Sequence, residues 1–455
     1  MSLKILLVQP TTEVLSGDNL APPLWPSILA SLTPNEHEVD FLHCGHERPT
    51  RKKLAKYDVV GISALTSNAN DAYRIGDMAR DAGVKCVIGG IHAYVMPKEA
   101  KGHCDSVMLG EAEYIWSKIL SDIQKNALSP FYRGAVTEPE DFPIPDLSIY
   151  RKYRFFTTKL AEIVRGCPHN CRFCGATMYS GRRYRYKNVD NLVAEIENWN
   201  SKRRIAHFTN TNLIASPRKT NEIMKRISDF NLRWWSPCSV DILHHEDVLA
   251  KVADAGCMVL QFGFDSISKE TLKSMNKSFN TKSDYRLLIK KCHDLGIEVG
   301  GSFIFGWDTD TKDVFKNTVE FACDADIDIP AYLPLTPFPG TDIFNCFSAQ
   351  GRITTTDWSN YNWHHCVFEP KNMTGEELLS GCYHAFEESY STRSIFHRFY
   401  SRPRGSKEMA LLLMFSVLGR SIISFSRPYW NGQETFAQRV TRHIPAHASS
   451  FKHRA

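Results

Sequence analysis

The fold can be traced outward from the stretch Cys167-Pro168-His169-Asn170-Cys171-Arg172-Phe173-Cys174, whose three cysteines have a C-x3-C-x2-C spacing. It directly follows Leu160–Arg165, a run that is typical of a buried strand. Soft thiolate ligands select iron–sulfur clusters, zinc or copper(I). A structural zinc site needs four ligands, usually from two C-x2-C pairs, and the sequence has no second pair. Three thiolates suit a cubane cluster with one iron left open, and a zinc site or a chance grouping is the alternative.

The spacing, with the aromatic Phe173 directly before the last cysteine, resembles the radical S-adenosylmethionine (SAM) superfamily. The resemblance implies that Cys167, Cys171 and Cys174 hold a 4Fe–4S cluster and that Phe173 lies at the SAM site. The open iron of the cluster would chelate the amino and carboxylate groups of SAM.

The composition is that of a large and nearly neutral protein. With 455 residues, of which 43% are hydrophobic, the chain can form two or three domains with sizeable cores. The 55 basic and 50 acidic residues give a net charge of +5, which is too balanced to favour nucleic acid as a partner. We find no secretory-signal pattern and no run of about 18 apolar residues that predicts a membrane span. The odd count of 13 cysteines, with a metal-type triplet, favours reduced thiols and therefore the cytoplasm.

Residues 1–135 alternate between apolar runs and helical patterns. The runs predict parallel strands at Lys4–Gln9, Glu38–Leu42, Asp58–Ala64, Lys85–Ile88 and Ser106–Leu109. Between two of them, Asn70–Ala82 has the apolar spacing of a helix. Alternating strands and helices with short connections predict a doubly wound α/β sheet, and ligands of such sheets bind outside the carboxyl ends of the strands.

Small and polar residues follow three of these strands and are candidate ligand contacts. They are Thr66, Ser67, Gly89, Gly90, His92, Gly110 and Glu111. Glycines let a large flat ligand approach the backbone, and the hydroxyls of Thr66 and Ser67 can bond its polar edge. Taken alone, the same residues also suit a generic Rossmann-like domain.

In combination, the motifs of this region resemble the cobalamin-binding domain of cobalamin-dependent radical SAM enzymes. They are, in chain order, Pro22-Pro23-Leu24, Gly61-Ile62-Ser63, Gly89-Gly90-Ile91-His92 and Gly110-Glu111-Ala112-Glu113. The resemblance implies bound cobalamin, contacted by the strand-end residues. The chain lacks the D-x-H-x-x-G element that supplies a lower cobalt ligand in other cobalamin proteins. We therefore expect no histidine lower ligand, and we interpret His92 as a hydrogen-bonding or structural residue.

Residues 136–150 are rich in proline and acidic side chains and are predicted to link two domains. From 151 to 345, strand and helix signals alternate about every thirty residues, as in a parallel barrel. We predict strands at Leu160–Val164, Ile205–Phe208, Arg233–Ser236, Met258–Phe262, Glu298–Phe303 and Ala331–Leu335. We predict helices at Val189–Asn200, Lys219–Phe230, Glu246–Ala255, Lys282–Leu295 and Lys312–Cys323. Six units match the partial, TIM-like (β/α)6 barrel that the radical SAM resemblance implies, with the cysteine loop at the carboxyl end of the first strand.

Polar residues at the ends of other barrel strands are candidates for binding SAM. Asn210 follows the second strand, where an amide can donate and accept hydrogen bonds. Asp265 and Ser266 follow the fourth, in a Gly263-Phe264-Asp265-Ser266 sequence that resembles the family's G-x-E-S and implies a carboxylate and a hydroxyl facing SAM. Gly301 lies in the fifth, where a glycine permits close approach of the adenosine.

Residues 346–455 are predicted to be mostly helical. We predict that the aromatic segment Asp357–Trp363 forms a lid over the barrel mouth. Thr374-Gly375-Glu376-Glu377 is a capping signal for a helix that runs to Tyr390. The apolar run Met409–Phe425 is short for a membrane span, so we expect a packed helix, with contact at a membrane surface as the alternative. Arg439–Ala455 is predicted to be flexible.

Together the resemblances imply a cobalamin-dependent radical SAM methyltransferase that acts on an unactivated carbon, or on phosphorus, of a small-molecule, lipid or natural-product substrate. In this scheme an external one-electron reductant of the flavodoxin or ferredoxin type reduces the cluster. A 5′-deoxyadenosyl radical then abstracts substrate hydrogen, and methylcobalamin supplies the methyl group. The alternatives are cyclisation, ring rearrangement or oxidation without net methyl transfer, and a cobalamin or redox sensor without catalysis. Methylation yields both 5′-deoxyadenosine and S-adenosylhomocysteine, other radical chemistry only the former, and a sensor neither.

Overall fold

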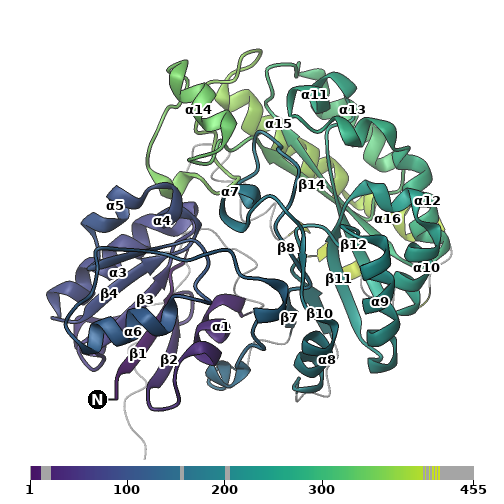
Figure 1. Cartoon of the computed structure of the whole chain (residues 1–455). Coiled ribbons are helices and arrows are strands. Elements are labelled where there is room, and N and C mark those ends of the chain that lie inside the picture. Colours follow the sequence, from purple (N-terminus) through teal and green to yellow (C-terminus); the bar gives the residue numbers. More distant parts are fainter. Residues whose placement is uncertain are drawn as a thin grey trace, which may run out of the picture.

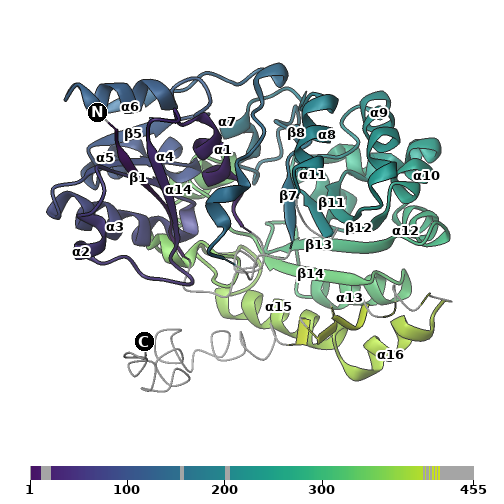
Figure 2. The same cartoon turned by 90° about the horizontal axis from the view of Figure 1, so that it is seen from below.

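The computed structural model describes residues 2–11, 22–153, 158–199 and 205–402, and beyond these residues 405, 409, 412–414, 416–417 and 419–420. Two parallel sheets, each covered by helices, lie side by side in Figures 1 and 2. The first sheet is built from residues up to 133, and the second begins at residue 159.

The first sheet has six parallel strands in the order β2-β1-β3-β4-β5-β6. They are β1 (Lys4–Gln9), β2 (Glu38–His43), β3 (Val59–Ser63), β4 (Lys85–Gly89), β5 (Ser106–Leu109) and β6 (Phe131–Arg133). The order reverses direction between β1 and β3, which confirms the predicted doubly wound sheet. The edge strand β6 was not predicted, because its three residues are too few to show the period of a strand in the sequence.

Helices cover both faces of this sheet. They are α1 (Leu24–Leu32), α2 (Arg51–Leu54), α3 (Ala69–Asp81), α4 (Ile91–Val95), α5 (Pro97–Gly102) and α6 (Trp116–Gln124). Alternate residues of β1 enter two separate cores: Leu6 and Val8 pack with residues of α3, and Ile5 and Leu7 pack with residues of α6. Burial on both faces explains why the strands are continuous apolar runs rather than alternating ones.

The second sheet also has six parallel strands, paired in chain order. They are β7 (Lys159–Ala161), β10 (Ile205–Phe208), β11 (Arg233–Cys238), β12 (Cys257–Asp265), β13 (Glu298–Phe305) and β14 (Ile329–Pro334). The intervening helices are α8 (Val189–Glu197), α9 (Pro217–Ile227), α10 (Glu246–Asp254), α11 (Lys269–Ser274), α12 (Tyr285–Asp294) and α13 (Asp313–Asp324). Helices α8, α9, α10 and α12 lie along the outer side of the strands in Figures 1 and 2. The predicted (β/α)6 barrel is confirmed.

The first barrel strand differs from the prediction of Leu160–Val164. The strand β7 ends at Ala161, and Val164–Arg165 form a separate strand, β8, that pairs antiparallel with β9 (Arg185–Tyr186). The side-chain oxygen of Asn210 accepts hydrogen bonds from the backbone N–H groups of Ile163 and Val164, at 2.9 and 3.1 Å. Asn210 thus replaces the neighbouring strand as a partner, and the chain leaves the sheet before the cysteine loop.

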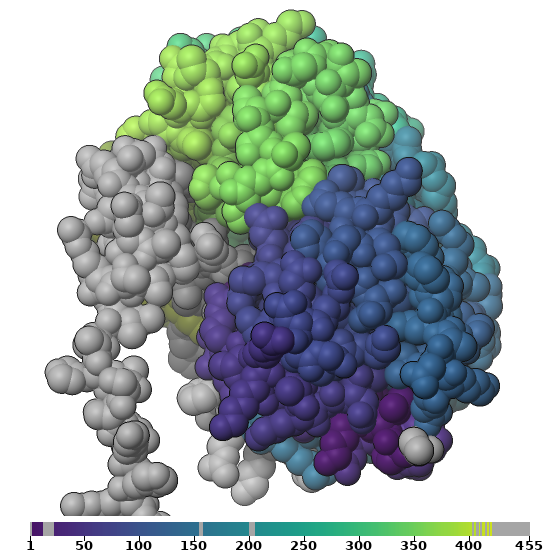
Figure 3. Space-filling model, turned by 90° about the vertical axis from the view of Figure 1, so that its left-hand side faces the viewer, coloured from purple at the N-terminus to yellow at the C-terminus, as the bar shows by residue number. Residues whose placement is uncertain are grey.

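The segment Asp357–Trp363 is not a lid over the barrel mouth, so that prediction is wrong. Its short helix η8 (Trp358–Asn360) packs on the first domain, where Trp358 and Tyr361 join the core that contains α3. The indole N–H of Trp358 donates to Glu99 at 2.7 Å. Figure 3 shows the green C-terminal region lying directly against the purple and blue first domain. Burial of the two large aromatic side chains therefore ties this segment to the first sheet, while Trp363 packs on Phe338 in the turn after β14.

The described C-terminal region contains the predicted helices, separated by an irregular stretch in which Ile353 and Phe368 form an antiparallel bridge. The helices are α14 (Asp342–Ala349), α15 (Gly375–Ser389) and α16 (Thr392–Tyr400). Thr374 and Glu377 form the predicted capping box, and α15 packs on β14 and α13. No helix among the described residues is long and apolar enough to cross a membrane. Only parts of Met409–Phe425 are described, and Arg439–Ala455 lies outside the described residues.

Candidate active site

The cysteine loop is held at its start and at its middle by backbone hydrogen bonds. Gly166 precedes it with a φ of 81°, and the N–H of Cys167 donates to the carbonyl of Gly181 at 3.1 Å. At the middle of the loop, the N–H of Arg172 donates to Met275 and its carbonyl accepts from Ile343, each at 3.0 Å. Segments after β12 and at the start of α14 therefore fix the loop at the carboxyl end of the barrel.

The three cysteines fit an iron–sulfur cluster better than a single zinc ion. Three ligand atoms that could share one metal ion should lie within about 4.8 Å of one another. Among the described residues one group of His, Cys, Asp or Glu meets this limit, and the three cysteines of the loop are not part of it. Around one zinc ion with Zn–S bonds of about 2.3 Å, sulfurs would lie about 3.8 Å apart. The ring of His169 stacks on Phe279 with centroids 4.0 Å apart, and among the described residues His169 belongs to no group of three such ligand atoms.

Burial raises the pKa of Cys171 to about 12 and also raises the pKa of Cys174. In the protein alone both thiols are therefore neutral at pH 7. Iron binding would hold them as thiolates, which are the ligand form of cysteine.

Asp265 has an unusual backbone conformation at the end of β12. Its φ is 61°, and the pairing of β12 with β13 shifts register between Gly263 and Asp265. Such irregularities re-aim side chains and cluster at functional sites. The Asp265 carboxylate pairs with Lys277, whose amino group also donates to the carbonyl of Gly263 at 2.7 Å. The charges of Asp265 and Lys277 both act on the pKa of Cys171, so this pair stands beside the cysteine loop.

The other predicted SAM contacts have different surroundings. Phe173 meets Trp307 edge to face, with ring centroids 6.0 Å apart, just beyond β13. The Ser266 hydroxyl accepts from the N–H of Ser268 at 3.1 Å, before α11. A Cβ at Gly301 would lie 2.9 Å from the ring of Phe264, so this residue faces the helix layer rather than the barrel interior. The amide of Asn210 is occupied by Ile163, Val164 and Ser236. Contact of these residues with SAM stays a prediction.

A cavity of about 380 Å³ lies between the two sheets. From the first domain it is lined by strand-end residues and by apolar side chains of α1 and α6, among them Gly61, Ser63, Gly89, Gly90, Glu111, Trp25 and Trp116. From the barrel it is lined by Leu160, Glu162, Arg165, Tyr179, Ser180 and Thr209. Glycines at the ends of adjacent strands, beside an apolar wall, form a cradle that fits a large ring such as that of cobalamin. The residues of α7 (Ala176–Ser180) directly follow the cysteine loop.

The predicted cobalamin contacts divide into two groups. Gly89, Gly90 and Glu111 line the cavity, whereas Thr66, Ser67, His92 and Gly110 are not among its lining residues. The ring of His92 is fully buried, its Nδ1 lies 3.2 Å from the Thr66 hydroxyl, and it packs edge to face on Trp358. Burial lowers the pKa of His92 to about 4, so the ring is neutral at pH 7.

Two predicted glycine contacts are needed by the protein's own backbone. Gly90 has a φ of 92°, and a Cβ there would lie 2.6 Å from the carbonyl oxygen of Ala64. Gly110 has a φ of 87°, and its Cβ would lie 2.9 Å from the carbonyl oxygen of Gly134. Both glycines therefore shape the strand ends, whatever ligand they contact.

A buried network of charges was not apparent from the sequence. The Glu111 carboxylate forms a two-point ion pair with Arg185, and the Arg165 guanidinium contacts Glu111, Glu113 and Glu162. Burial opposes ionisation of Glu111, but hydrogen bonds from Arg185 and the charge of Arg165 outweigh it and lower the pKa of Glu111. The only sequence signal is the charged pair in Gly110-Glu111-Ala112-Glu113, which does not reveal its partners.

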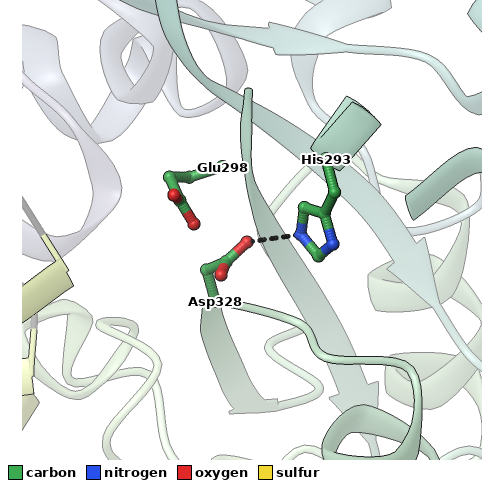
Figure 4. Close-up of side chains that lie close together, drawn as sticks. All are labelled: His293, Glu298 and Asp328. Carbon is green, nitrogen blue, oxygen red and sulfur yellow. Dashed lines mark hydrogen bonds and ion pairs between the residues drawn. The ribbon is translucent and has the colours of Figure 1, made fainter. Parts of the chain in front are cut away.

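A second group of ligand-type side chains lies at the opposite, amino end of the barrel strands. It consists of His293, Glu298 and Asp328, which Figure 4 shows around the starts of β13 and β14. Asp328 accepts from His293 at 2.8 Å and from the N–H of Val299 at 2.7 Å. Arg402 adds a guanidinium 2.6 Å from Glu298. The arginine balances the carboxylate charge, and we interpret the group as an anchor for the chain after α16.

Models of two protein families match the chain in the order of its two sheets. The B12 binding domain matches residues 14–120, and the Radical SAM superfamily matches residues 161–322. These matches confirm the predicted cofactors: cobalamin for the first domain, and a 4Fe–4S cluster with SAM for the second.

Curated relatives and solved structures agree with these matches. The bacteriochlorophyllide d C-12(1)-methyltransferase of Chlorobaculum tepidum is 31% identical over 414 residues, covering 88% of this chain and 90% of that protein. The C-8(2)-methyltransferase of the same organism is 30% identical over 404 residues, covering 83% and 87%. The radical SAM methyltransferase TsrM of Kitasatospora setae, solved with cobalamin and a [4Fe-4S] cluster, has a TM-score of 0.70 at 16% identity. Its alignment covers 94% of this chain and 100% of that chain.

The likeness to TsrM shows a shared fold, and the methyltransferase relatives align along nearly their whole length. On this evidence the chain belongs to the cobalamin-dependent enzymes of the radical SAM superfamily, on the methyltransferase side of that family.

Proposed function

We propose that the protein methylates an unactivated carbon of a mainly apolar small molecule that binds in the cavity between the two sheets. The observation that carries this proposal is the lining of the cavity. One wall is made of strand ends of the cobalamin-binding sheet, and the other of residues next to the cysteine loop. When bound, the cluster with SAM supplies a radical that removes a substrate hydrogen, and cobalamin supplies the methyl group that replaces it.

The protein's own contribution is to bind, orient and shield the substrate. The apolar side chains Trp25, Leu29 and Trp116 exclude water from one end of the cavity. Burial raises the pKa of Tyr179, so its hydroxyl remains protonated and can donate a hydrogen bond to a polar group of the substrate. Thr209 already donates to the carbonyl of Ala161 at 3.3 Å, and its oxygen can accept from the substrate.

We propose a tetrapyrrole of the bacteriochlorophyllide type as the first substrate class to test. Two relatives at 31% and 30% identity are named for methylation of bacteriochlorophyllide d, at positions C-12(1) and C-8(2). Leu29, Trp25 and Trp116 give one side of the cavity an apolar surface that suits a ring of this kind. Charged side chains, among them Glu113, Glu162 and Arg165, line the other side.

We also propose an external one-electron reductant of the flavodoxin or ferredoxin type. The described residues hold one loop of the radical SAM type, and all 13 cysteines are free. Cys44, Cys86 and Cys292 are buried in the cores, and within the described residues none of them belongs to a group of three ligand atoms that could hold a metal ion. Free thiols throughout support a reducing compartment, for which we propose the cytoplasm.

Contact with an anionic membrane surface is a further part of the proposal. Phe396 and Tyr400 of α16 are exposed, as are Leu413, Met414 and Val417 further along the chain, while Leu412 is buried. Residues 393–455 contain eleven Lys and Arg and two Asp and Glu. Apolar side chains beside a basic segment suit the surface of a bilayer with anionic lipids. Cosedimentation with vesicles of anionic phospholipid, but not of phosphatidylcholine alone, is the expected result, and equal partition between the two would contradict it.

Product analysis tests the proposed chemistry. The protein is reconstituted anaerobically with iron, sulfide and cobalamin, and is given SAM, a reductant and bacteriochlorophyllide d. Methylation predicts equal amounts of 5′-deoxyadenosine, S-adenosylhomocysteine and methylated product. Formation of 5′-deoxyadenosine with a changed but unmethylated product would favour the alternative of cyclisation, rearrangement or oxidation. If SAM is consumed and the tetrapyrrole is unchanged, the substrate class is wrong.

A further inference from the structure

We infer that two ion pairs, Glu111–Arg185 and Glu113–Arg165, set the separation between the cobalamin-binding sheet and the cysteine loop. In this role they are positioning residues for methyl transfer across the cavity. The inference rests on the proposed function, because it concerns the reach of a methyl group from SAM at the barrel to cobalamin at the first sheet.

The pairs join the two cofactor-binding segments directly. Glu111 and Glu113 belong to the loop after β5, which lines the cavity from the side of the cobalamin-binding sheet. Arg165 stands two residues before Cys167, and Arg185 is its direct partner in the β8–β9 pair. A shift of either carboxylate relative to its arginine would therefore move the strand ends of the first domain against the cysteine loop.

The contacts are close and almost without solvent. The side chains of Glu111 and Arg185 are 3% and 1% exposed, and an Arg185 Nη1 to Glu111 Oε2 distance is 2.8 Å. Arg165 Nη1 lies 2.8 Å from Glu113 and 3.1 Å from Glu111. Charged groups held in this way have little freedom to rearrange, because a two-point arginine–carboxylate pair fixes orientation as well as distance.

The segment between the domains, residues 136–150, takes part in the same contact. The N–H of Thr137 donates to Glu111 at 2.7 Å, and Arg185 donates to the carbonyl of Thr137. The ring of Phe142 lies under both guanidinium groups, 4.5 Å from that of Arg165 and 5.6 Å from that of Arg185. The predicted linker, residues 136–150, is therefore fastened at the cavity rather than free to bend.

The neighbouring pair Arg183–Glu138 provides a matched control. It also joins the β8–β9 segment to residues 136–150, but its side chains are 60% and 49% exposed. Glu111→Gln leaves the Arg185 guanidinium buried without its carboxylate, which is costly, whereas Glu138→Gln removes a solvated pair of small value.

The test compares two reactions of SAM in the reconstituted holoenzyme with titanium(III) citrate and without substrate. In one, the S–CH3 bond breaks, the methyl group goes to reduced cobalamin, and the electron pair stays on sulfur as S-adenosylhomocysteine. In the other, one electron from the reductant breaks the bond from sulfur to C5′, which gives methionine and a 5′-deoxyadenosyl radical. Without substrate, this radical takes a hydrogen atom from a C–H bond of the buffer, here glycerol, to give 5′-deoxyadenosine. Only in the first reaction does a group, the methyl group, have to cross the cavity. The ratio of methylcobalamin to 5′-deoxyadenosine therefore reports the separation of the two domains.

Glu111→Gln is expected to lower this ratio about tenfold to a hundredfold, since a misplacement of about 1 Å has that effect on group transfer. Glu138→Gln is expected to leave it unchanged. In the protein without cofactors, Glu111→Gln but not Glu138→Gln should also speed hydrogen–deuterium exchange of residues 110–113 and 136–150.

An unchanged ratio in Glu111→Gln would overturn the inference, and so would loss of cobalt with an unchanged ratio per cobalt, which would make Glu111 a cofactor contact instead. A wild-type protein that forms no methylcobalamin would overturn the proposed function itself. If Glu111→Gln does not fold, Glu113→Gln replaces it, because Arg165 then keeps Glu111 and Glu162. A smaller fall in the same ratio supports the inference, and no fall overturns it.

Discussion

Replacing Gly166 by alanine should prevent the cysteine loop from holding its cluster. Gly166 has a φ of 81°, and a Cβ there would lie 2.2 Å from the carbonyl oxygen of Arg183 and 2.8 Å from that of Ser180. Both neighbours are backbone atoms, so no side-chain rotation relieves the overlap. Gly181 is the matched control, because its φ is 79° but the nearest atom to its Cβ, on Val136, is 3.9 Å away.

The magnitudes follow from these two geometries. A Cβ at the positive φ of Gly166 costs about 1–2 kcal/mol. Gly181 has φ 79° and ψ 169°, a region that is essentially restricted to glycine, so about 1–3 kcal/mol is the whole expected effect in Gly181→Ala. Overpacking adds about 1–3 kcal/mol in Gly166→Ala, for a total of about 2–5 kcal/mol. Since each 1.4 kcal/mol is tenfold, the closed loop of Gly166→Ala is disfavoured about 30-fold to 5000-fold.

The assay is iron content per chain after anaerobic reconstitution, followed by competition with a chelator. Gly166→Ala should lose iron to the chelator at concentrations that leave the wild type and Gly181→Ala loaded. Circular dichroism and thermal unfolding report whether the barrel is still folded. Equal iron retention in Gly166→Ala and Gly181→Ala would refute the argument that the approach to Arg183 fixes the loop.

The remaining predictions concern the cluster, the cobalamin-binding sheet and pH. Replacing Cys167, Cys171 or Cys174 by alanine should abolish the cluster absorbance and all cleavage of SAM. Cys86→Ala should leave the iron content unchanged. Gly90→Ala should lower the cobalt-to-iron ratio, because its Cβ meets the backbone of Ala64. Gly83→Ala is the control and should not lower it, because Gly83 has a φ of 75° but open space around its Cβ. Equal cobalt-to-iron ratios in the two variants would contradict the role of Gly90. Burial raises the pKa of Asp310 from 3.8 to about 6, so the folded state keeps a proton that the unfolded state releases, and stability should fall by at most about 3 kcal/mol as pH rises from 4 to 6. Asp310→Asn should remove this fall in denaturant titrations, and parallel curves for the two proteins would contradict the shift.

Local sequence patterns predict much of the fold. The strands of both sheets are short apolar runs, and their alternation with helical periods predicts parallel sheets. The cysteine spacing marks the carboxyl end of the first barrel strand, which places the site. The capping box at Thr374 and Glu377 is likewise complete within four residues, and it forms as predicted.

What the sequence does not reveal depends on partners that are distant along the chain. The break between β7 and β8 follows from hydrogen bonds of Asn210 to residues 46 and 47 positions away. Glu111 and Arg185 are separated by 74 residues, and charge alone does not select one partner among many. The aromatic content of Asp357–Trp363 predicts burial, but not that Trp358 would find its partner at Glu99 in the first domain.

Two glycines of β13 show a second reason why the sequence alone does not place every site residue. Gly300 and Gly301 are adjacent in β13, so one faces the barrel interior and the other the helices. A one-residue error in strand register exchanges these two roles, and the sequence alone does not fix that register.

The metal content of the wild-type protein tests whether one chain holds a 4Fe–4S cluster and cobalamin at opposite walls of one cavity. After anaerobic reconstitution and gel filtration, iron and cobalt should elute together with the protein, in the ratio of one cobalt to each cluster. A wild-type protein that takes up iron but never cobalamin would contradict the account and leave a radical SAM barrel without a methyl carrier.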